Sequence, residues 1–335
     1  METASVRRIP LTLQTLYADL AQQVASSHLR AGSVYRRTLK GIEYLYVKVP
    51  VGQDRHDRFL GRADDPQVQA QVAAIEDETA RTQERRQTVR MLRGRDIPGP
   101  TPDLGRVLDA LAYADLFRRG AVLVGTAAYQ CYAPLVGAYL PSASLMTQDA
   151  DLATASLAIS ASEQESLETV LKRADRTFAP IPGLKPKAPP WRFRSASGFL
   201  VDLLTPQLRR TDSTPMLIPH LGAGAVPLQH LSWLIQDPVG AVALFGAGIP
   251  VMVPQPARYA VHKLIIAQKR ASDAAKRRKD LLQAQALLEA LLQEDPFAVS
   301  DAVADARDRG ISGWAQPIQR SLTELGLTDR LPIVA

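Results

Sequence analysis

Cysteine is almost absent from this 335-residue chain, and it has no long hydrophobic run. With Cys131 as its one cysteine, the chain cannot form an internal disulfide framework or a cysteine-based zinc site. The longest apolar tract, residues 239–254, is shorter than the roughly 20 residues of a spanning helix, and glycine and proline interrupt it. The N-terminus lacks the apolar stretch of a secretory signal. We therefore expect a cytoplasmic protein without a membrane partner, in which this tract is buried structure.

Charge is only modestly unbalanced. The chain has 40 Lys and Arg against 34 Asp and Glu, which gives a net charge of +6. Such a balance favours phosphorylated partners such as an NTP or RNA, although solvated surface cations would give the same total. The length exceeds that of one average domain. We predict three regions, residues 1–98, 99–254 and 255–335, with the first boundary in the Pro- and Gly-rich stretch 97–102.

The N-terminal region shows one helical pattern, a strand-rich segment and a second, longer helical pattern. Lys40-Gly41 divides the strand-rich segment, as a hairpin turn would, and Asp64-Asp65-Pro66 is a helix start. The middle of the long helix is strongly polar around Arg85, which predicts that it projects or packs on a partner chain. The predicted elements are a helix at 11–27, a hairpin at 32–49, a strand at 57–61 and a long helix from 64. This region is expected to bind the acceptor or to mediate dimerisation.

Helical and strand patterns alternate from residue 101 onward, and the end of the chain is almost wholly helical. The stretch 180–190 is rich in proline and is predicted to be a loop. Predicted helices are 103–118, 162–174, 257–270, 273–292, 296–309 and 314–325, and predicted strands are 121–124, 199–204 and one around Asp149.

Gly125 and Thr126 follow a short apolar strand and open a helix. Glycine permits close approach of a ligand to the backbone, and free N–H groups at a helix start suit a phosphate. Thr126 is predicted to cap that helix and to bond a phosphate oxygen. The pattern alone also fits an ordinary turn between a strand and a helix.

Three acidic residues lie on two predicted apolar strands. Asp149 and Asp151 are two apart, so their side chains point to the same face of one strand. Two such carboxylates are costly to bury unless a divalent cation lies between them. Asp202 is a single acid within Phe-Leu-Val-Asp-Leu-Leu, where it needs a metal ion or an ion-pair partner such as Arg192 or Arg194. Together they predict a two-metal site in which Asp202 is a ligand or the general base.

The order Gly125-Thr126, Asp149-x-Asp151, Asp202 resembles that of the nucleotidyltransferase superfamily typified by DNA polymerase β. The chain is still more similar to an uncharacterised bacterial nucleotidyltransferase-like family. That resemblance rests on LKGIEYLYVKV with RFLG, VLVGTAAYQCY, QDADLA, FLVDLLTP, VPQPARYAVHKLIIAQKR and RRKDLLQA. Thr126 replaces the usual serine, and the gap from Gly125 to Asp149 is longer than usual, which leaves the sheet topology open.

The resemblance implies an α+β fold, in which helices flank a mixed sheet that carries the three acids, with a helical C-terminal part. It implies a Mg²⁺- or Mn²⁺-dependent transfer of an NMP from an NTP, with release of pyrophosphate. Lys263 and Arg270 share one helix face, and the resemblance makes Lys263 and Lys279 the leading phosphate-binding residues.

The acceptor stays open among a protein hydroxyl, an RNA end and a small molecule, and a homodimer is one option for the assembly. The alternative function is a catalytically inactive nucleotide- or RNA-binding regulatory module, related to toxin–antitoxin or defence systems.

Overall fold

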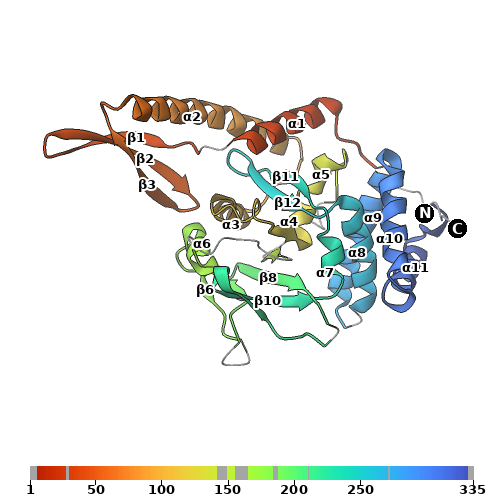
Figure 1. Cartoon of the computed structure of the whole chain (residues 1–335). Helices are drawn as coiled ribbons and strands as arrows, with labels where there is room; N and C mark the ends of the chain where they lie inside the picture. The colour runs from red at the N-terminus through yellow and green to blue at the C-terminus, as the bar shows by residue number, and fades with distance from the viewer. Residues whose placement is uncertain are drawn as a thin grey trace.

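The structure is a computed structural model, and it describes residues 6–27, 30–141, 149–154, 165–183, 188–209, 211–270 and 272–330. Among the helices within these ranges, none combines the length and apolar character needed to cross a membrane. The fold is α+β with a mixed sheet, as predicted. A small three-stranded sheet extends to one side of the body, and helices near the C-terminus gather at the other (Figure 1).

The N-terminal region consists of α1 (Leu11–Ser26), β1 (Ser33–Leu39), β2 (Ile42–Val51), β3 (Asp54–Arg62) and α2 (Pro66–Arg93). The three strands form an antiparallel meander. Lys40 and Gly41 both have positive φ angles, 51° and 78°, as a two-residue hairpin turn requires. The predicted hairpin is therefore confirmed, and the predicted third strand is longer than expected.

Helix α2 packs on two different partners along its length. The Asp65 side chain caps it by accepting a hydrogen bond from the Gln67 backbone N–H. Ile75 packs in a small hydrophobic cluster with Val47 and Val49 of β2, so the first half of α2 covers one face of the sheet. The second half joins the main core through buried apolar residues that include Leu92.

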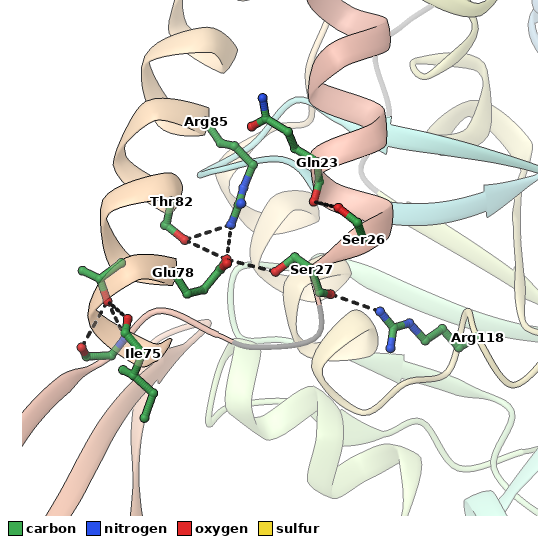
Figure 2. A network of polar contacts seen from close by, with 10 residues as sticks. Gln23, Ser26, Ser27, Ile75, Glu78, Thr82, Arg85 and Arg118 are labelled. Atoms are coloured by element: carbon green, nitrogen blue, oxygen red, sulfur yellow. Dashed lines mark hydrogen bonds and ion pairs between the residues drawn. The ribbon is translucent and has the colours of Figure 1, made fainter. Parts of the chain in front are cut away.

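A buried polar network joins α2 to α1 (Figure 2). The Arg85 guanidinium donates to Glu78 Oε1 at 2.5 Å and to Thr82 Oγ1 at 2.9 Å. Ser27, just after α1, donates to the same Glu78 oxygen at 2.9 Å. The prediction that the polar middle of α2 projects or packs on a partner chain was wrong for Arg85, because its charge is neutralised within this chain.

The central sheet is mixed. Its strands run in the order β4-β5-β8-β10-β9, with β7 pairing beside the first half of β8 and β6 beyond it. Strand β5 is antiparallel to β4 and parallel to β8, and β8 is parallel to β10. The strands are β4 (Val122–Val124), β5 (Asp149–Ala153), β6 (Ala179–Pro180), β7 (Arg192–Arg194), β8 (Leu200–Pro206), β9 (Met216–Ile218) and β10 (Ala223–Leu228).

Helices around this sheet differ from the predicted ones mainly at their ends. Helix α3 (Pro102–Tyr113) stops before the predicted residue 118, because Asp115 adopts a positive φ of 57°. Helix α6 (Leu167–Ala174) begins after its cap Ser166, and residues 162–164 of the predicted helix lie outside the described ranges. The short elements are α4 (Gly125–Tyr129), α5 (Tyr132–Leu135), η2 (Pro219–Leu221) and α7 (Leu231–Leu234).

The apolar tract 239–254 is a buried hairpin of β11 (Val239–Ala243) and β12 (Ile249–Val253). The predicted C-terminal helices are present as α8 (Pro256–Lys269), α9 (Ala274–Glu294), α10 (Pro296–Asp308) and α11 (Gln316–Leu325), with η3 (Ile311–Ala315) and η4 (Thr328–Arg330). One core cluster contains residues of all three predicted regions, from Ile9 to Leu327. The division into three regions stays a prediction.

Candidate active site

One row of residues across the central sheet brings two of the predicted acids together. In the strand register, Val124 lies opposite Asp151, Asp151 opposite Asp202, and Asp202 opposite Arg192. Paired residues on neighbouring strands present their side chains to the same face of a sheet, roughly 5 Å apart. The two carboxylates are therefore neighbours, with a guanidinium on the far side of Asp202.

Asp149 extends this group along β5. It lies two residues before Asp151 and therefore on the same face of the strand. Burial increases along the series, since Asp149 is exposed, Asp151 is half-buried and Asp202 is 7% exposed. The structure thus places the three predicted acids on one face of two adjacent parallel strands.

The Gly125 turn lies directly against Asp151. Gly125 has a φ of +64°, and a Cβ at this position would collide with Asp151 Oδ2. The Tyr259 hydroxyl, from α8, donates a hydrogen bond to the Gly125 carbonyl oxygen at 2.9 Å. Glycine is needed here both for the backbone conformation and for the close approach of the carboxylate.

Thr126 does not cap the helix that follows. Helix α4 begins at Gly125, its N-cap is Val124, and no side chain bonds its first turn. Thr126 is the second residue of the helix, so the predicted capping role was wrong. Its predicted contact with a phosphate stays a prediction.

Electrostatics single out Asp151 among the three acids. Burial, followed by the charges of Asp149 and Asp202, raises the pKa of Asp151 from 3.8 to about 7. Lys263 and Arg192 act in the opposite direction, without offsetting the rise. Ionised Asp151 is therefore poorly compensated in the protein alone, and an added cation would stabilise it.

Asp202 has an ion-pair partner within the chain. Arg192 donates from Nε to Asp202 Oδ1 at 2.7 Å and from Nη2 to Oδ2 at 2.5 Å. The guanidinium also lies 4.5 Å from the centre of the Trp191 ring. Of the two partners that the sequence left open for Asp202, Arg192 is the one present in this arrangement.

The predicted phosphate-binding cations gather at α8 and α9, close to the acids. Lys263 Nζ forms a buried ion pair with Asp280 Oδ1 at 2.6 Å. Arg270 Nε lies 2.8 Å from Asp280 Oδ2, as an ion pair without hydrogen-bond geometry. The charge of Lys263 acts on Asp151, and Asp149 acts on the pKa of Lys279. Lys263 and Lys279 thus share the electrostatic environment of the carboxylates, whereas Arg270 is placed only by its pair with Asp280.

The carboxyl oxygens of Asp149 and Asp151 suit a hard divalent cation, which prefers oxygen ligands, and the raised pKa of Asp151 is the change that such an ion would reverse. At Asp202 a metal ion would compete with Arg192, because both carboxylate oxygens accept a hydrogen bond from that guanidinium. Within the described ranges, no group of three His, Cys, Asp or Glu side chains is arranged to hold a metal ion. The metal site stays a prediction. Its best-supported part is the pair of Asp149 and Asp151.

Two residues of this site were missed at the level of sequence. Tyr259 supports the Gly125 turn, and Asp280 holds both Lys263 and Arg270. Tyr259 precedes Lys263 by four residues and therefore lies on the same helix face, which is a signal that the sequence does contain. Asp280 lies on a different helix from its partners, so no spacing rule links it to them.

Comparison with known proteins gives the family. The model of a family described as nucleotidyltransferase matches residues 102–308, a segment that contains every site residue discussed above. An antigenic nucleotidyltransferase-like protein from Paracoccidioides brasiliensis has a similar structure at 15% identity, over 68% of this chain and 94% of that one, with a TM-score of 0.32. No curated protein matches the chain. The family match extends over more than half of the chain, and the chain belongs to this nucleotidyltransferase family.

Proposed function

We propose that the protein is a metal-dependent nucleotidyltransferase, which transfers an NMP from an NTP to an acceptor hydroxyl and releases pyrophosphate. The single observation that carries the proposal is the placement of Asp149, Asp151 and Asp202 on one face of adjacent parallel strands, with Gly125 against Asp151. The family match supports transferase chemistry of this general kind. Metal dependence, the identity of the NTP and the acceptor belong to the proposal.

Each group has a definite task in the proposed reaction. Asp149 and Asp151 would hold the divalent cation, which would offset part of the triphosphate charge and make the α-phosphorus more electrophilic. The backbone N–H groups of Gly125 and Thr126 are the proposed donors to phosphate oxygens. Lys263 and Lys279 supply positive charge beside the same carboxylates. These residues bind and orient the nucleotide before any bond changes.

The transfer step needs a group that removes a proton from the acceptor. The acceptor oxygen attacks the α-phosphorus, the bond to the β-phosphate oxygen breaks, and pyrophosphate leaves with that electron pair. Asp202 is the proposed base for the acceptor proton. Arg192 donates one hydrogen bond to each Asp202 oxygen, and this ion pair makes the carboxylate a weaker base. In the proposed reaction the guanidinium turns away from Asp202 before the proton is transferred.

A labelling experiment tests the proposal. The purified protein is incubated with each of the four NTPs, labelled at the α-phosphate, together with Mg²⁺ or Mn²⁺ and a cell extract. We expect acid-stable label on one class of macromolecule or small molecule, and loss of labelling in Asp149→Ala. The matched control is Asp301→Ala, which removes an exposed acid on α10. Nucleotide binding without transfer under all of these conditions would favour the inactive regulatory module.

A further inference from the structure

The outer face of the N-terminal sheet has a continuous patch of aromatic and basic side chains, which we call the aromatic–basic face. In the strand register, Tyr35 lies opposite Tyr46, and Tyr46 opposite Phe59. Arg37 lies opposite Tyr44 in the same way. Alternation along the strands places Asp57, opposite Lys48, on the same side of the sheet. The aromatic and basic residues of this face are Tyr35, Arg37, Tyr44, Tyr46, Lys48 and Phe59.

The opposite side of the same sheet is the packed one. Leu45, Val47, Val49 and Val51 alternate with the tyrosines along β2, and all four are buried. Val47, Val49 and Val51 pack with Ile75 of α2. The aromatic residues are therefore not needed to close the core under α2. Phe59 is 55% exposed, although a phenylalanine in a core position would be covered.

The rings form one connected surface. The centres of the Tyr35 and Tyr46 rings lie 5.6 Å apart with an interplanar angle of 21°. Phe59 lies 5.3 Å from Tyr46 and 5.8 Å from Tyr44, measured between ring centres. Contacts of this kind stabilise a sheet by themselves, which explains the pairs but not the exposure of Phe59.

Positive charge accompanies the rings. The Arg37 guanidinium lies 5.2 Å from the Tyr46 ring centre, and Lys48 Nζ lies 5.4 Å from that of Tyr35. Arg37 also has an exposed ion pair with Asp57 at 3.7 Å. Counting both sides of the sheet, residues 33–62 contain seven Lys or Arg and three Asp or Glu, which gives a net charge of +4 out of the chain's +6. Arg36 and Arg58 lie on the side opposite the rings. A polyanion is the partner whose charge complements this surface.

We propose that the aromatic–basic face binds single-stranded RNA, and that this RNA is the acceptor. The inference rests on the proposed function for its link to catalysis. The exposed Phe59 ring and the half-buried tyrosine rings lie beside cations. Such a surface suits unpaired bases and their phosphates, because a base can stack on a ring while the backbone contacts a charge. In a duplex the faces of the bases are covered by stacking, so a duplex would contact only the charged side chains of this face. The Tyr44 and Tyr46 hydroxyls can also bond the ribose 2′-hydroxyl, which DNA lacks, whereas the Tyr35 hydroxyl is buried.

The sheet is attached to the catalytic part of the chain at the β2–β3 turn. Gly52 N donates to Asp109 Oδ2 of α3 at 3.1 Å, and Gln53 N donates to the Arg173 carbonyl of α6 at 3.0 Å. The Lys40-Gly41 turn is at the other end of the sheet, away from the body (Figure 1). RNA bound along the sheet would therefore have one end beside the part of the chain that carries Asp151.

Binding is measured by fluorescence anisotropy with a labelled single-stranded oligoribonucleotide of mixed sequence, without NTP or divalent cation. We expect Phe59→Ala to weaken binding about 5- to 150-fold, the range found when one stacking ring is removed. The matched control is Phe297→Ala, which removes a 79% exposed phenylalanine from α10 and should leave affinity unchanged. Equal affinity of the two variants would overturn the proposal.

A second pair of variants tests the charges. Lys48→Gln removes a cation from the aromatic–basic face, and we expect it to reduce the slope of log affinity against log salt by about 0.7. Arg58→Gln removes an exposed cation from β3 on the opposite side of the sheet and should change the slope less. Stronger binding of DNA of the same sequence, or of duplex RNA, would also contradict the proposal. So would a dimer that Phe59→Ala converts to a monomer, since the occupant would then be a second copy.

The RNA-binding experiment and the labelling experiment can refute their two hypotheses separately. Asp149→Ala should bind RNA as the wild type does, because Asp149 is not on this face. RNA binding that depends on Phe59, with no transfer of label, would refute the proposed function alone. Transfer to an acceptor without any RNA binding would refute this inference alone.

Discussion

Replacing Asp151 with asparagine should stabilise the metal-free protein at neutral and alkaline pH. The raised pKa of Asp151, about 7 against 3.8, means that the folded protein favours the protonated carboxyl. Asparagine keeps the size and polarity of that carboxyl without its charge. A difference of one in pKa corresponds to about 1.4 kcal/mol, so ionised Asp151 costs the fold at most about 4 kcal/mol.

The sign of the pH dependence follows from proton uptake. Between about pH 4 and pH 7 the folded protein retains a proton on Asp151 that the unfolded chain has lost. The free energy of unfolding of the wild type therefore falls as pH rises through this range, and it levels off above about pH 7. Asp151→Asn lacks this contribution, so its advantage over the wild type should be small at acidic pH and largest at alkaline pH.

Urea denaturation in EDTA, at about pH 5 and about pH 8, measures this difference. We expect Asp151→Asn to exceed the wild type by a few kcal/mol at the higher pH and by much less at the lower one. The control Asp301→Asn, on exposed α10, should differ from the wild type equally at both. An advantage that is absent or independent of pH would refute the reasoning. Adding Mn²⁺ should stabilise the wild type more than Asp151→Asn.

Three further variants test the neighbouring residues. Asp202→Asn should lower kcat by at least about 100-fold with little change in nucleotide affinity, since a base acts in the transfer step. Labelling measures kcat, and calorimetry measures the affinity. Gly125→Ala should cost about 1–2 kcal/mol in urea denaturation because of its φ of +64°, and it should abolish labelling because the new Cβ displaces the Asp151 carboxylate. Lys263→Met should lower the free energy of unfolding by about 3 kcal/mol, because it removes one partner of the buried pair with Asp280; full stability would contradict this account.

Local signals in the sequence predicted the elements that depend on local chemistry. The Lys40-Gly41 turn identified its hairpin, because few residues tolerate the left-handed conformation found there. Asp65 and the proline after it identified the start of α2. The α+β class and the strands with Asp149, Asp151 and Asp202 followed from the pattern of acids on apolar segments together with the family resemblance.

Contacts between distant segments could not be predicted in this way. The row that places Asp151, Asp202 and Arg192 side by side depends on strand order, since β8 pairs with β5 on one side and β7 on the other. Sequence reasoning named Arg192 as one possible partner of Asp202 but could not select it. The buried network of Arg85 was missed in part for the same reason. Glu78 is on the same helix as Arg85, but Ser27, which joins this network to α1, lies far away in the sequence.

The Asp202 carboxylate can be compensated by Arg192 or by a metal ion. Because Arg192 is part of the chain, this buried charge is compensated even when no substrate is bound. A buried carboxylate needs a cation, and Arg192 supplies one through two hydrogen bonds. Asp151, in the same row, keeps a raised pKa because of its burial and the charges of Asp149 and Asp202, and the charge of Arg192 does not offset the rise. A divalent ion held by Asp149 and Asp151 would therefore bind first where charge is least compensated. Its approach would also weaken the hold of Arg192 on Asp202, since two cations beside one carboxylate repel each other. In this scheme the binding of nucleotide and metal ion separates Asp202 from Arg192. Asp202 can then act as a base, so the site becomes competent for transfer only when its ligands are bound.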